Sequence, residues 1–218
     1  MQENEIKIPR ALSYEDINRA TFKTIELSEE WQKHLGVPQL GNSHWLIYGG
    51  SGQGKTSYAL QVVKEICKSQ KVHYNTLEEG TKLSFKKALE RSNIKSANSK
   101  FTYQKENLTE LTARLDRKNQ AKVIVIDSVQ YFFRRKSIED YFKFCEDFEN
   151  TTFIWISGAD GNRPKGAIAD DIYYDADIVV KIDNYEAVIE KNRFEAYESR
   201  VIWQQGFEDR QAKLVRKG

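Results

Sequence analysis

The segment that most constrains the fold of this chain is "GGSGQGKT", residues 49–56, which lies between two apolar runs. Glycine loses more conformational freedom on folding than any other residue, so a glycine cluster indicates a backbone that must adopt unusual angles. The segment fits the pattern G-x-x-x-x-G-K-[ST], with the β-type run "HWLIY" before it and the helical pattern "KTSYALQVVKEICKSQ" after it. In this context such a turn wraps a phosphate with inward-pointing N–H groups and a helix N-terminus.

The loop supplies a set of candidate nucleotide-binding residues. They are Gly49, Gly50, Ser51, Gly52, Gln53, Gly54, Lys55, Thr56 and Ser57. We expect Lys55 to reach the β- and γ-phosphates of ATP and Thr56 to place its hydroxyl on Mg²⁺. The alternative is a flexible Gly/Ser turn that happens to precede a lysine, and the flanking strand and helix patterns argue against it.

The rest of the chain predicts an α/β fold. Short apolar or β-branched runs indicate strands at 44–48, 72–77, 123–127, 152–157 and 177–182. Segments with helical spacing lie at 55–70, 82–91, 109–118 and 137–148. Apolar strands separated by helices are typical of a mostly parallel central sheet flanked by helices on both faces. The runs "EAVIEKNRF" and "ESRVIWQQ" follow at hairpin distances, so antiparallel strands are expected at the C-terminal end.

The ends of the chain differ from this pattern. Residues 1–43 are polar, and "SYEDINRA" and "SEEWQKHLG" each begin with a serine N-cap followed by acidic residues. We therefore divide the chain into an N-terminal helical arm or linker (1–43), an α/β core that carries the phosphate loop (44–208) and a basic C-terminal tail (209–218). The composition predicts a globular protein with a net charge of +2, which by itself does not indicate a nucleic-acid partner.

The cysteine content and the hydropathy of the chain limit the cellular locations that are expected for it. Cys67 and Cys145 are the only cysteines, and no CxxC pair exists, so a cysteine zinc site and a disulfide scaffold are excluded. No apolar run approaches the roughly 18 residues of a membrane span, and "MQENEIKIPR" has no apolar signal-peptide region. We expect a cytoplasmic protein with no membrane partner.

Acidic residues follow two of the predicted strands. The run "VIVID" ends in Asp127, at the sheet edge where ligands of open α/β sheets bind, and we expect this carboxylate to hold Mg²⁺ with Thr56. The alternative is an aspartate that caps the next turn. Glu78 and Glu79 follow the strand at 72–77, and one of them can orient the attacking water. Spacing alone does not separate this role from that of first-turn acids of a helix starting near Gly80.

The order of "GGSGQGKT", "TLEEG", "VIVIDSVQ", "ISGADGNRPKGAIADDIYYDADIVV" and "KNRF" resembles RecA-like P-loop ATPases. It looks most like the ATPase core of RadA/Sms recombination proteins, with DnaB-type helicases and KaiC as more distant relatives. The first glutamate of the RadA element that resembles "TLEEG" is the catalytic base, which implies this role for Glu78. The resemblance also makes Ser128 and Gln130 candidate sensors of the γ-phosphate.

"KNRF", residues 191–194, resembles the RadA motif K-N-R-F-G. In that wider family a lysine and an arginine on this strand reach the nucleotide of a neighbouring subunit, which implies the same for Lys191 and Arg193 and predicts a homo-oligomer, as a hexameric ring or a filament. Strand alternation would place both on one face; the alternative is a solvated pair on an edge strand. The chain departs from the family at Glu195, where RadA has glycine, at Ala159–Asp160, where RadA-like proteins have a nearby lysine, and in having no zinc-binding cysteines.

Two loops are candidates for single-stranded DNA. RecA-like rings present loops to a central channel at positions that correspond here to "YFFRRKS" (131–137) and "GADGNRPKGA" (158–167). The candidate contacts are Arg134, Arg135, Lys136, Arg163 and Lys165, with the aromatic residues at 131–133 available for base stacking. The alternatives are a buried aromatic cap on the sheet and a solvated basic turn.

The sequence therefore predicts a Mg-ATP-dependent ATPase that acts on single-stranded DNA in recombination, repair or replication. A small-molecule or nucleotide kinase shares the phosphate loop and is the first alternative. A nucleotide-gated assembly switch that scarcely hydrolyses ATP is the second. The three histidines match no metal-ligand spacing.

Overall fold

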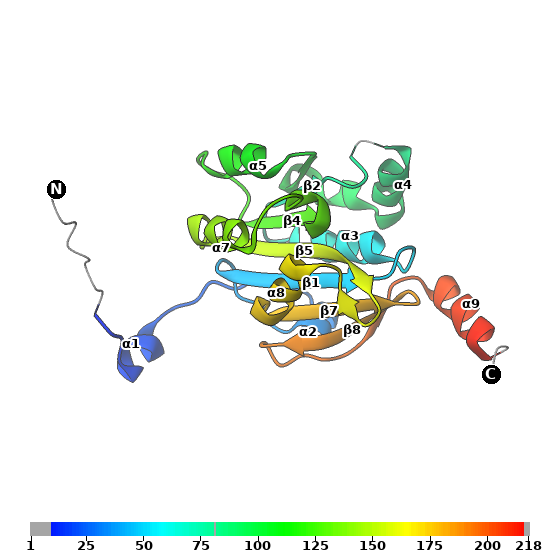
Figure 1. The fold of residues 1–218 in the computed structure, drawn as a ribbon. Coiled ribbons are helices and arrows are strands. Elements are labelled where there is room, and N and C mark those ends of the chain that lie inside the picture. The colour runs from blue at the N-terminus through cyan, green and yellow to red at the C-terminus, as the bar shows by residue number, and fades with distance from the viewer. Residues whose placement is uncertain (1–9, 81, 216–218) are drawn as a thin grey trace.

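The computed structural model describes residues 10–80 and 82–215, and Figure 1 shows a central sheet with helices on both faces. The strands of this part are β1 (Ser43–Gly49), β2 (Val72–Thr76), β3 (Phe101–Gln104), β4 (Val123–Asp127), β5 (Thr152–Asp160), β6 (Arg163–Pro164), β7 (Ile178–Asp183), β8 (Glu186–Asn192) and β9 (Arg200–Val201). Their order in the sheet is β3-β2-β4-β5-β1-β7-β8-β9, and β6 pairs with β5.

The sheet is parallel from β3 to β7 and antiparallel from β7 to β9. This confirms the predicted α/β fold with a mostly parallel sheet and antiparallel strands at the end. The five predicted strands are present, and each is an apolar run that is buried on both faces except near its ends. β3 was not predicted, because "FTYQ" is an exposed edge strand without an apolar alternation.

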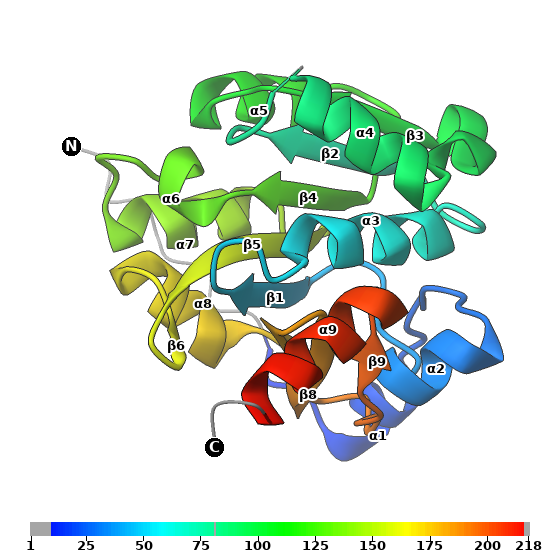
Figure 2. The ribbon, with the colours of Figure 1, turned by 90° about the vertical axis from the view of Figure 1, so that its right-hand side faces the viewer.

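The helices are α1 (Tyr14–Arg19), α2 (Glu29–Leu35), α3 (Lys55–Ile66), α4 (Leu83–Ser92), α5 (Leu108–Leu115), α6 (Val129–Phe132), α7 (Ile138–Asp147), α8 (Ala167–Asp175) and α9 (Gln204–Val215), with a 3₁₀ helix η1 at Ile94–Lys100 (Figure 2). One face of the sheet packs against α2, α3 and α4, and the other packs against α5, α6, α7 and α8. Alternate residues of β1 separate the two cores: Trp45 and Ile47 face the first, Leu46 and Tyr48 the second.

The N-terminal segment is divided between an exposed part and the core. α1 begins with a capping box from Ser13 and Asp16, as its sequence predicts, but buries no residue and lies away from the sheet (Figure 1). In contrast, Ile25, Trp31 and Leu35 are buried in the core. Residues 25–43 therefore belong to the core and not to an arm, because the apolar side chains of this segment pack in the same cluster as residues of β1 and α3.

The C-terminal segment is more helical than its sequence suggests. β9 contains only Arg200–Val201, and α9 runs through most of the segment that we assigned to a basic tail. Gly206 and the preceding hairpin pattern obscured this helix in the sequence. Residues 216–218 of the predicted tail, and residues 1–9 of the predicted arm, lie outside the described residues. Among the described residues, no helix is both long and apolar enough to cross a membrane.

Candidate functional site

The glycine-rich segment is a turn between β1 and α3, as the motif requires. Gly54 precedes the first residue of α3 and has a φ of 107°, a value that L side chains rarely adopt. At Gly49 the constraint is steric, because a Cβ atom there would lie 2.3 Å from the carbonyl oxygen of Ile182 on β7. The two glycines are thus needed for the backbone path of the loop and for its close packing on the sheet.

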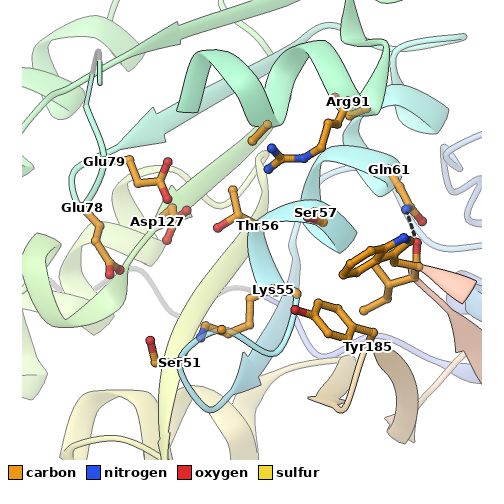
Figure 3. Close-up of a pocket in the computed structure, with 16 residues that line it drawn as sticks. Ser51, Lys55, Thr56, Ser57, Gln61, Glu78, Glu79, Arg91, Asp127 and Tyr185 are labelled. Carbon is orange, nitrogen blue, oxygen red and sulfur yellow. Dashed lines mark hydrogen bonds between the residues drawn. The ribbon is translucent and has the colours of Figure 1, made fainter. Parts of the chain in front are cut away.

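A cavity of about 650 Å³ opens beside this turn (Figure 3). It is lined by Ser51, Gly52, Gly54, Lys55, Thr56, Ser57, Gln61, Glu78, Glu79, Ala88, Arg91, Ser92, Asp127, Tyr185, Ile202 and Trp203. Most of the predicted loop residues therefore reach it. Gly49, Gly50 and Gln53 are not among its lining residues, because Gly49 and Gly50 connect the turn to β1 and the Gln53 amide oxygen accepts a hydrogen bond from the Asn184 N–H.

Asp127 is the last residue of β4 and lies in the floor of the cavity. Its carboxylate accepts a hydrogen bond from the Tyr74 hydroxyl at 2.8 Å, and Ser128, not Asp127, is the N-cap residue of α6. The pKa of Asp127 is raised to about 6. Burial is the largest cause, the nearby carboxylates of Glu78 and Glu79 act in the same direction, and the hydrogen bond from Tyr74 and the charge of Lys55 oppose the change. A cation placed beside a buried carboxylate that has one hydrogen-bond donor stabilises its charged form.

Glu78 and Glu79 lie in a turn at residues 77–80, and α4 begins only at Leu83. They are therefore not first-turn acids of a helix. The turn is fixed on β4, because the N–H groups of Leu77 and Glu78 donate to the Asp127 carbonyl oxygen at 2.7 and 3.2 Å. In Figure 3 Glu79 points toward Asp127 and Glu78 toward the end of the phosphate loop.

The acidic floor fits a divalent cation bound together with phosphate. One carboxylate oxygen of Glu79 is buried and has no hydrogen-bond partner among the described residues, and Thr56 presents its hydroxyl to the same cavity. Within the described residues, no cluster of three or more His, Cys, Asp or Glu residues is arranged to hold a metal alone. The residues present therefore fit Mg²⁺ that shares its coordination with phosphate oxygens and water, held by Thr56 and Asp127.

Lys55 is the first residue of α3 and faces the acidic floor. Its amine donates to the Gly50 carbonyl oxygen at 2.8 Å. Burial lowers the pKa of Lys55, and the charges of Glu78 and Asp127 oppose this change. The cavity thus holds one ammonium group and three carboxylates around a space open to a phosphate chain.

Gln130 and Ser128 flank the start of α6. Ser128 is buried as the N-cap residue, without a side-chain cap hydrogen bond. Gln130 donates to the Ser157 hydroxyl and to the Lys165 carbonyl oxygen, both at 2.7 Å, and accepts from the Gly158 N–H at 3.3 Å. Neither residue lines the cavity. Gln130 connects the two loops that we consider for nucleic acid, so its role as a γ-phosphate sensor stays a prediction.

Lys191 and Arg193 lie at the opposite end of the strands from the phosphate loop. Lys191 donates to the Tyr174 carbonyl oxygen at 2.7 Å, and Arg193 pairs with Asp177, just before β7, at 3.5 Å. The expected alternation does not extend to Arg193, because β8 ends at Asn192 and a bulge shifts its register. Both cations are therefore remote from the phosphate loop of their own chain.

The two predicted nucleic-acid loops differ in exposure. Arg134, Arg135 and Lys136 are exposed at the end of α6, but Phe132 and Phe133 are 3 and 4% exposed in the core. The expectation of a three-ring stacking surface is therefore wrong, and only Tyr131 is available. In the second loop, Arg163 pairs with Asp170 at 2.6 Å and covers the Tyr173 ring, whereas Lys165 is exposed.

The cavity also contains residues that sequence reasoning missed. Gln61 on α3, Arg91 on α4, and Tyr185 and Trp203 near the C-terminal strands belong to no motif. Their positions depend on how distant segments pack. The one local signal is "DNYE" at 183–186, where an asparagine and a tyrosine occupy a tight turn between two strands.

Comparison with solved structures identifies similar folds. The flagellar accessory protein FlaH from Methanocaldococcus jannaschii is 16% identical and has a TM-score of 0.60, over 81% of this chain and 91% of that chain. A second solved structure, an ATPase domain, is 16% identical with a TM-score of 0.57, over 85% and 90% of the two chains. A KaiC-like protein from Pyrococcus horikoshii OT3 is 18% identical with a TM-score of 0.57, over 82% and 89%.

Sequence comparison adds no relative. No protein-family model matches the chain, and a search of the curated proteins finds no match. At 16–18% identity the structural likenesses establish the fold. Together with the sheet order and the phosphate loop, they show that this chain has the RecA-like P-loop NTPase fold.

Proposed function

We propose that this protein is a Mg-ATP-dependent ATPase that acts on single-stranded DNA in recombination, repair or replication, as a homo-oligomeric ring or filament. One observation carries the ATPase part. A single cavity joins the phosphate loop with Lys55 to the carboxylates of Asp127, Glu78 and Glu79 (Figure 3). Among the uses of a P-loop fold, hydrolysis needs both phosphate-binding donors and a carboxylate that orients water.

The residues have separable roles in this mechanism. The loop amides and the α3 N-terminus bind the phosphates, and Lys55 leaves the Gly50 carbonyl to contact the β- and γ-phosphates. Bound Mg²⁺ would neutralise phosphate charge, held by Thr56 and Asp127. Glu78, exposed beside Lys55, accepts a proton from the attacking water and orients it.

The RadA-like part of the proposal is that Lys191 and Arg193 act in the site of a neighbouring subunit. Their distance from the phosphate loop of their own chain supports a role in trans. Asp177 and the Tyr174 carbonyl hold them in this chain, and a neighbour's nucleotide would have to compete with these partners. An assembled ring or filament would then complete each site with charge from the adjacent chain.

The DNA part rests on a smaller surface than the sequence suggested. It comprises Tyr131, Arg134, Arg135, Lys136 and Lys165, which are exposed. Gln130 ties the two loops together, so that binding at one loop can shift the other. We also propose a cytoplasmic location, which agrees with Cys67 and Cys145 as free thiols.

Steady-state ATP hydrolysis per subunit tests the proposal. The assay measures phosphate release with water as the only acceptor, over a range of protein concentrations, with and without single-stranded DNA at fixed salt. We expect specific activity to rise with concentration and further with DNA. Lys55→Ala should lower it at least roughly 100-fold, whereas Lys64→Ala, on the same helix, should not change it. Activity that depends on a phosphate acceptor would favour a kinase, and tight ATP binding without release would favour the assembly switch.

Mixing variants tests the shared site. Arg193→Ala and Lys55→Ala should each be nearly inactive alone. A mixture should regain part of the activity, because some mixed interfaces combine an intact phosphate loop with an intact arginine. An Arg193→Ala protein with normal turnover would contradict the role in trans.

A triple variant tests the DNA surface. Combined Arg134→Ser, Arg135→Ser and Lys136→Ser changes should remove DNA stimulation, because they remove the exposed cations that would contact phosphates. Lys86→Ser with Lys87→Ser on α4, where both lysines are exposed, serves as the control for loss of charge elsewhere. Full DNA stimulation of the triple variant would contradict the assignment of this loop.

A further inference from the structure

The end of the cavity away from the acidic floor is aromatic. Tyr185, Ile202 and Trp203 line it, and Figure 3 shows Tyr185 on the side of α3 remote from Asp127. The Tyr185 and Trp203 rings meet edge to face, with centroids 5.1 Å apart at 83°. Ile202 is buried, Tyr185 is half-buried, and Trp203 is 53% exposed. The cavity thus has one charged end and one aromatic end.

Tyr185 occupies a backbone conformation that is unusual for a tyrosine. Asp183 pairs with Glu186, so Asn184 and Tyr185 form a two-residue turn between β7 and β8, with φ values of 48° and 63°. A turn of this kind needs positive φ at both positions, and glycine is the common second residue. A tyrosine there is strained, and such strain is concentrated at functional sites. Since the ring lines the cavity, its side chain offers a reason for keeping the strained residue.

The turn is also fixed to the phosphate loop. The Tyr185 N–H donates to the Gln53 carbonyl oxygen at 3.2 Å, and the Asn184 N–H donates to the Gln53 side-chain oxygen at 2.7 Å. The Tyr185 ring packs on Gly54, where an added Cβ would lie 3.0 Å from its Cδ1 atom. The ring therefore has a set position relative to the groups that bind phosphate. The side-chain oxygen and the carbonyl oxygen of Gln53 position the ring, and its backbone N–H stays one of the loop amides that we propose for phosphate.

The wall behind the ring is held from two sides. The Ile202 N–H donates to the Tyr185 carbonyl oxygen at 2.7 Å, and the Gln61 amide donates to the Ile202 carbonyl oxygen at 2.9 Å. Arg91 lines the cavity from α4, on the opposite side, and the described part of the structure shows no hydrogen bond or ion pair for it. A flat group that enters from the phosphate loop meets a fixed ring and a cationic residue.

We propose that Tyr185 is the base-stacking platform of the nucleotide site and that the site selects purine nucleoside triphosphates by ring area. This inference rests on the proposed function, because it requires a nucleotide whose phosphates lie on the loop at 49–56. The Gln61 amide nitrogen already donates to the Ile202 carbonyl oxygen, which leaves Gln61 less free to bond to the edge of a base. The site therefore separates purines from pyrimidines more than adenine from guanine.

Titration calorimetry on the full chain with Mg²⁺ tests this. The ligands are non-hydrolysable analogues of ATP, GTP, CTP and UTP, together with inorganic triphosphate. We expect the two purine analogues to bind within about tenfold of each other and more tightly than the pyrimidine analogues. Tyr185→Asn tolerates the turn conformation but has no ring, and it should weaken purine binding by roughly tenfold or more while leaving inorganic triphosphate unchanged. Tyr185→Phe keeps the ring and should bind as the original chain does.

Trp203 provides a second measurement. The other tryptophans, Trp31, Trp45 and Trp155, are at most 5% exposed, so nucleotide-dependent fluorescence reports on Trp203. Purine analogues should change this emission, and inorganic triphosphate should not. Unchanged ATP-analogue binding by folded Tyr185→Asn would overturn the inference and leave the proposed function intact. If the unsubstituted protein bound none of these ligands, the proposed function itself would be overturned.

Discussion

Two buried carboxylates on either side of β2 show how similar burial can serve different ends. Glu106 is 7% exposed and Asp127 is 4% exposed. Burial acts to raise the pKa of both. At Glu106, hydrogen bonds from Arg114 and His73 outweigh burial and the pKa is lowered. At Asp127 the one donor among the described residues, Tyr74, does not outweigh burial, and the pKa rises to about 6. The charge of Glu106 is stabilised by hydrogen-bond donors within the fold, and the charge of Asp127 is not.

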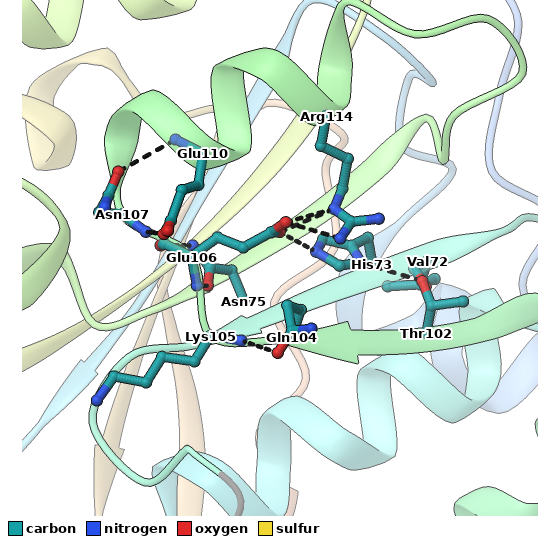
Figure 4. Close-up of polar contacts among 10 residues, drawn as sticks. All are labelled: Val72, His73, Asn75, Thr102, Gln104, Lys105, Glu106, Asn107, Glu110 and Arg114. Atoms are coloured by element: carbon teal, nitrogen blue, oxygen red, sulfur yellow. Dashed lines mark hydrogen bonds and ion pairs between the residues drawn. The ribbon is translucent and has the colours of Figure 1, made fainter.

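Figure 4 shows how completely the Glu106 cluster is connected. Its carboxylate accepts from Arg114 Nε at 2.7 Å and pairs with His73 Nε2 at 2.9 Å. Its backbone exchanges hydrogen bonds with the Asn75 side chain, both at 2.8 Å. This cluster joins β2 to the segment between β3 and α5. The comparison teaches that a buried carboxylate with a full set of hydrogen-bond partners holds parts of the fold together. A group of buried carboxylates that lacks such partners indicates a ligand-binding site.

Asp127→Asn should give the largest effect. We expect ATP hydrolysis to fall at least roughly 100-fold, because the amide cannot replace the carboxylate beside Mg²⁺. The free energy of unfolding at pH 7.5 should rise by about 2 kcal/mol, since a buried charge with a raised pKa is removed. Phosphate release and denaturant unfolding on the same preparation check both. A destabilised variant would show that Asp127 is a structural carboxylate like Glu106.

Glu106→Gln should give the opposite outcome. Removal of this charge leaves Arg114 and His73 without their partner, and we expect the free energy of unfolding to fall by about 3 kcal/mol. Affinity of the folded protein for an ATP analogue should be unchanged. The control is Glu90→Gln, which removes an exposed pair with Lys86 and should change stability by less than about 0.5 kcal/mol. Equal effects of the two changes would contradict a structural role for the Glu106 cluster.

The phosphate end of the site could be predicted because its residues carry local signals. Lys55 and Thr56 belong to a spaced motif, and Asp127 ends an apolar strand, so the parallel sheet brings them to one edge. The aromatic end could not be predicted. Tyr185 and Trp203 come from segments far along the chain from the loop, and they reach it only through β7–β8 pairing and the Gln53 hydrogen bonds.

The errors have a common physical cause. An aromatic run beside basic residues fits both a stacking surface and a core, and Phe132 and Phe133 pack on Trp155 beneath the sheet. Arg163 likewise pairs with a local partner, Asp170. The sequence spacing of the two residues does not show whether Arg163 forms this pair or is a solvated loop residue. The Glu106 cluster was not predicted either, because its members meet only when β3 and α5 dock on β2. Composition identifies such residues, and only packing decides which of their two uses is realised.

Tyr74→Phe sharpens the comparison at Asp127 itself. It removes the hydroxyl that donates to the buried carboxylate, and we expect the free energy of unfolding to fall by about 2 kcal/mol at pH 7.5. Tyr141→Phe is the matched control. Its ring is also fully buried, but its hydroxyl donates to the exposed Asp175, so about 0.5 kcal/mol is expected. Similar losses in urea unfolding would mean that burial of the acceptor does not set the strength of these bonds.

The pH dependence of stability should show the smallest and most specific difference. Burial lowers the pKa values of His34, His44 and His73, so the unfolded chain binds more protons than the folded chain below pH 6.5, and acidification destabilises. The raised pKa of Asp127 acts in the opposite sense, because the folded chain then binds the extra proton as the pH falls through about 6.

In the metal-free protein with a chelator, the original chain should therefore lose less stability than Asp127→Asn between pH 7.5 and 5. The slopes should differ by up to about 1.4 kcal/mol per pH unit below pH 6, which is one proton, and should coincide above pH 7. Urea unfolding at several pH values measures this difference directly. Parallel slopes throughout would mean that Asp127 keeps an ordinary pKa, and the contrast with Glu106 would then rest on hydrogen bonding alone.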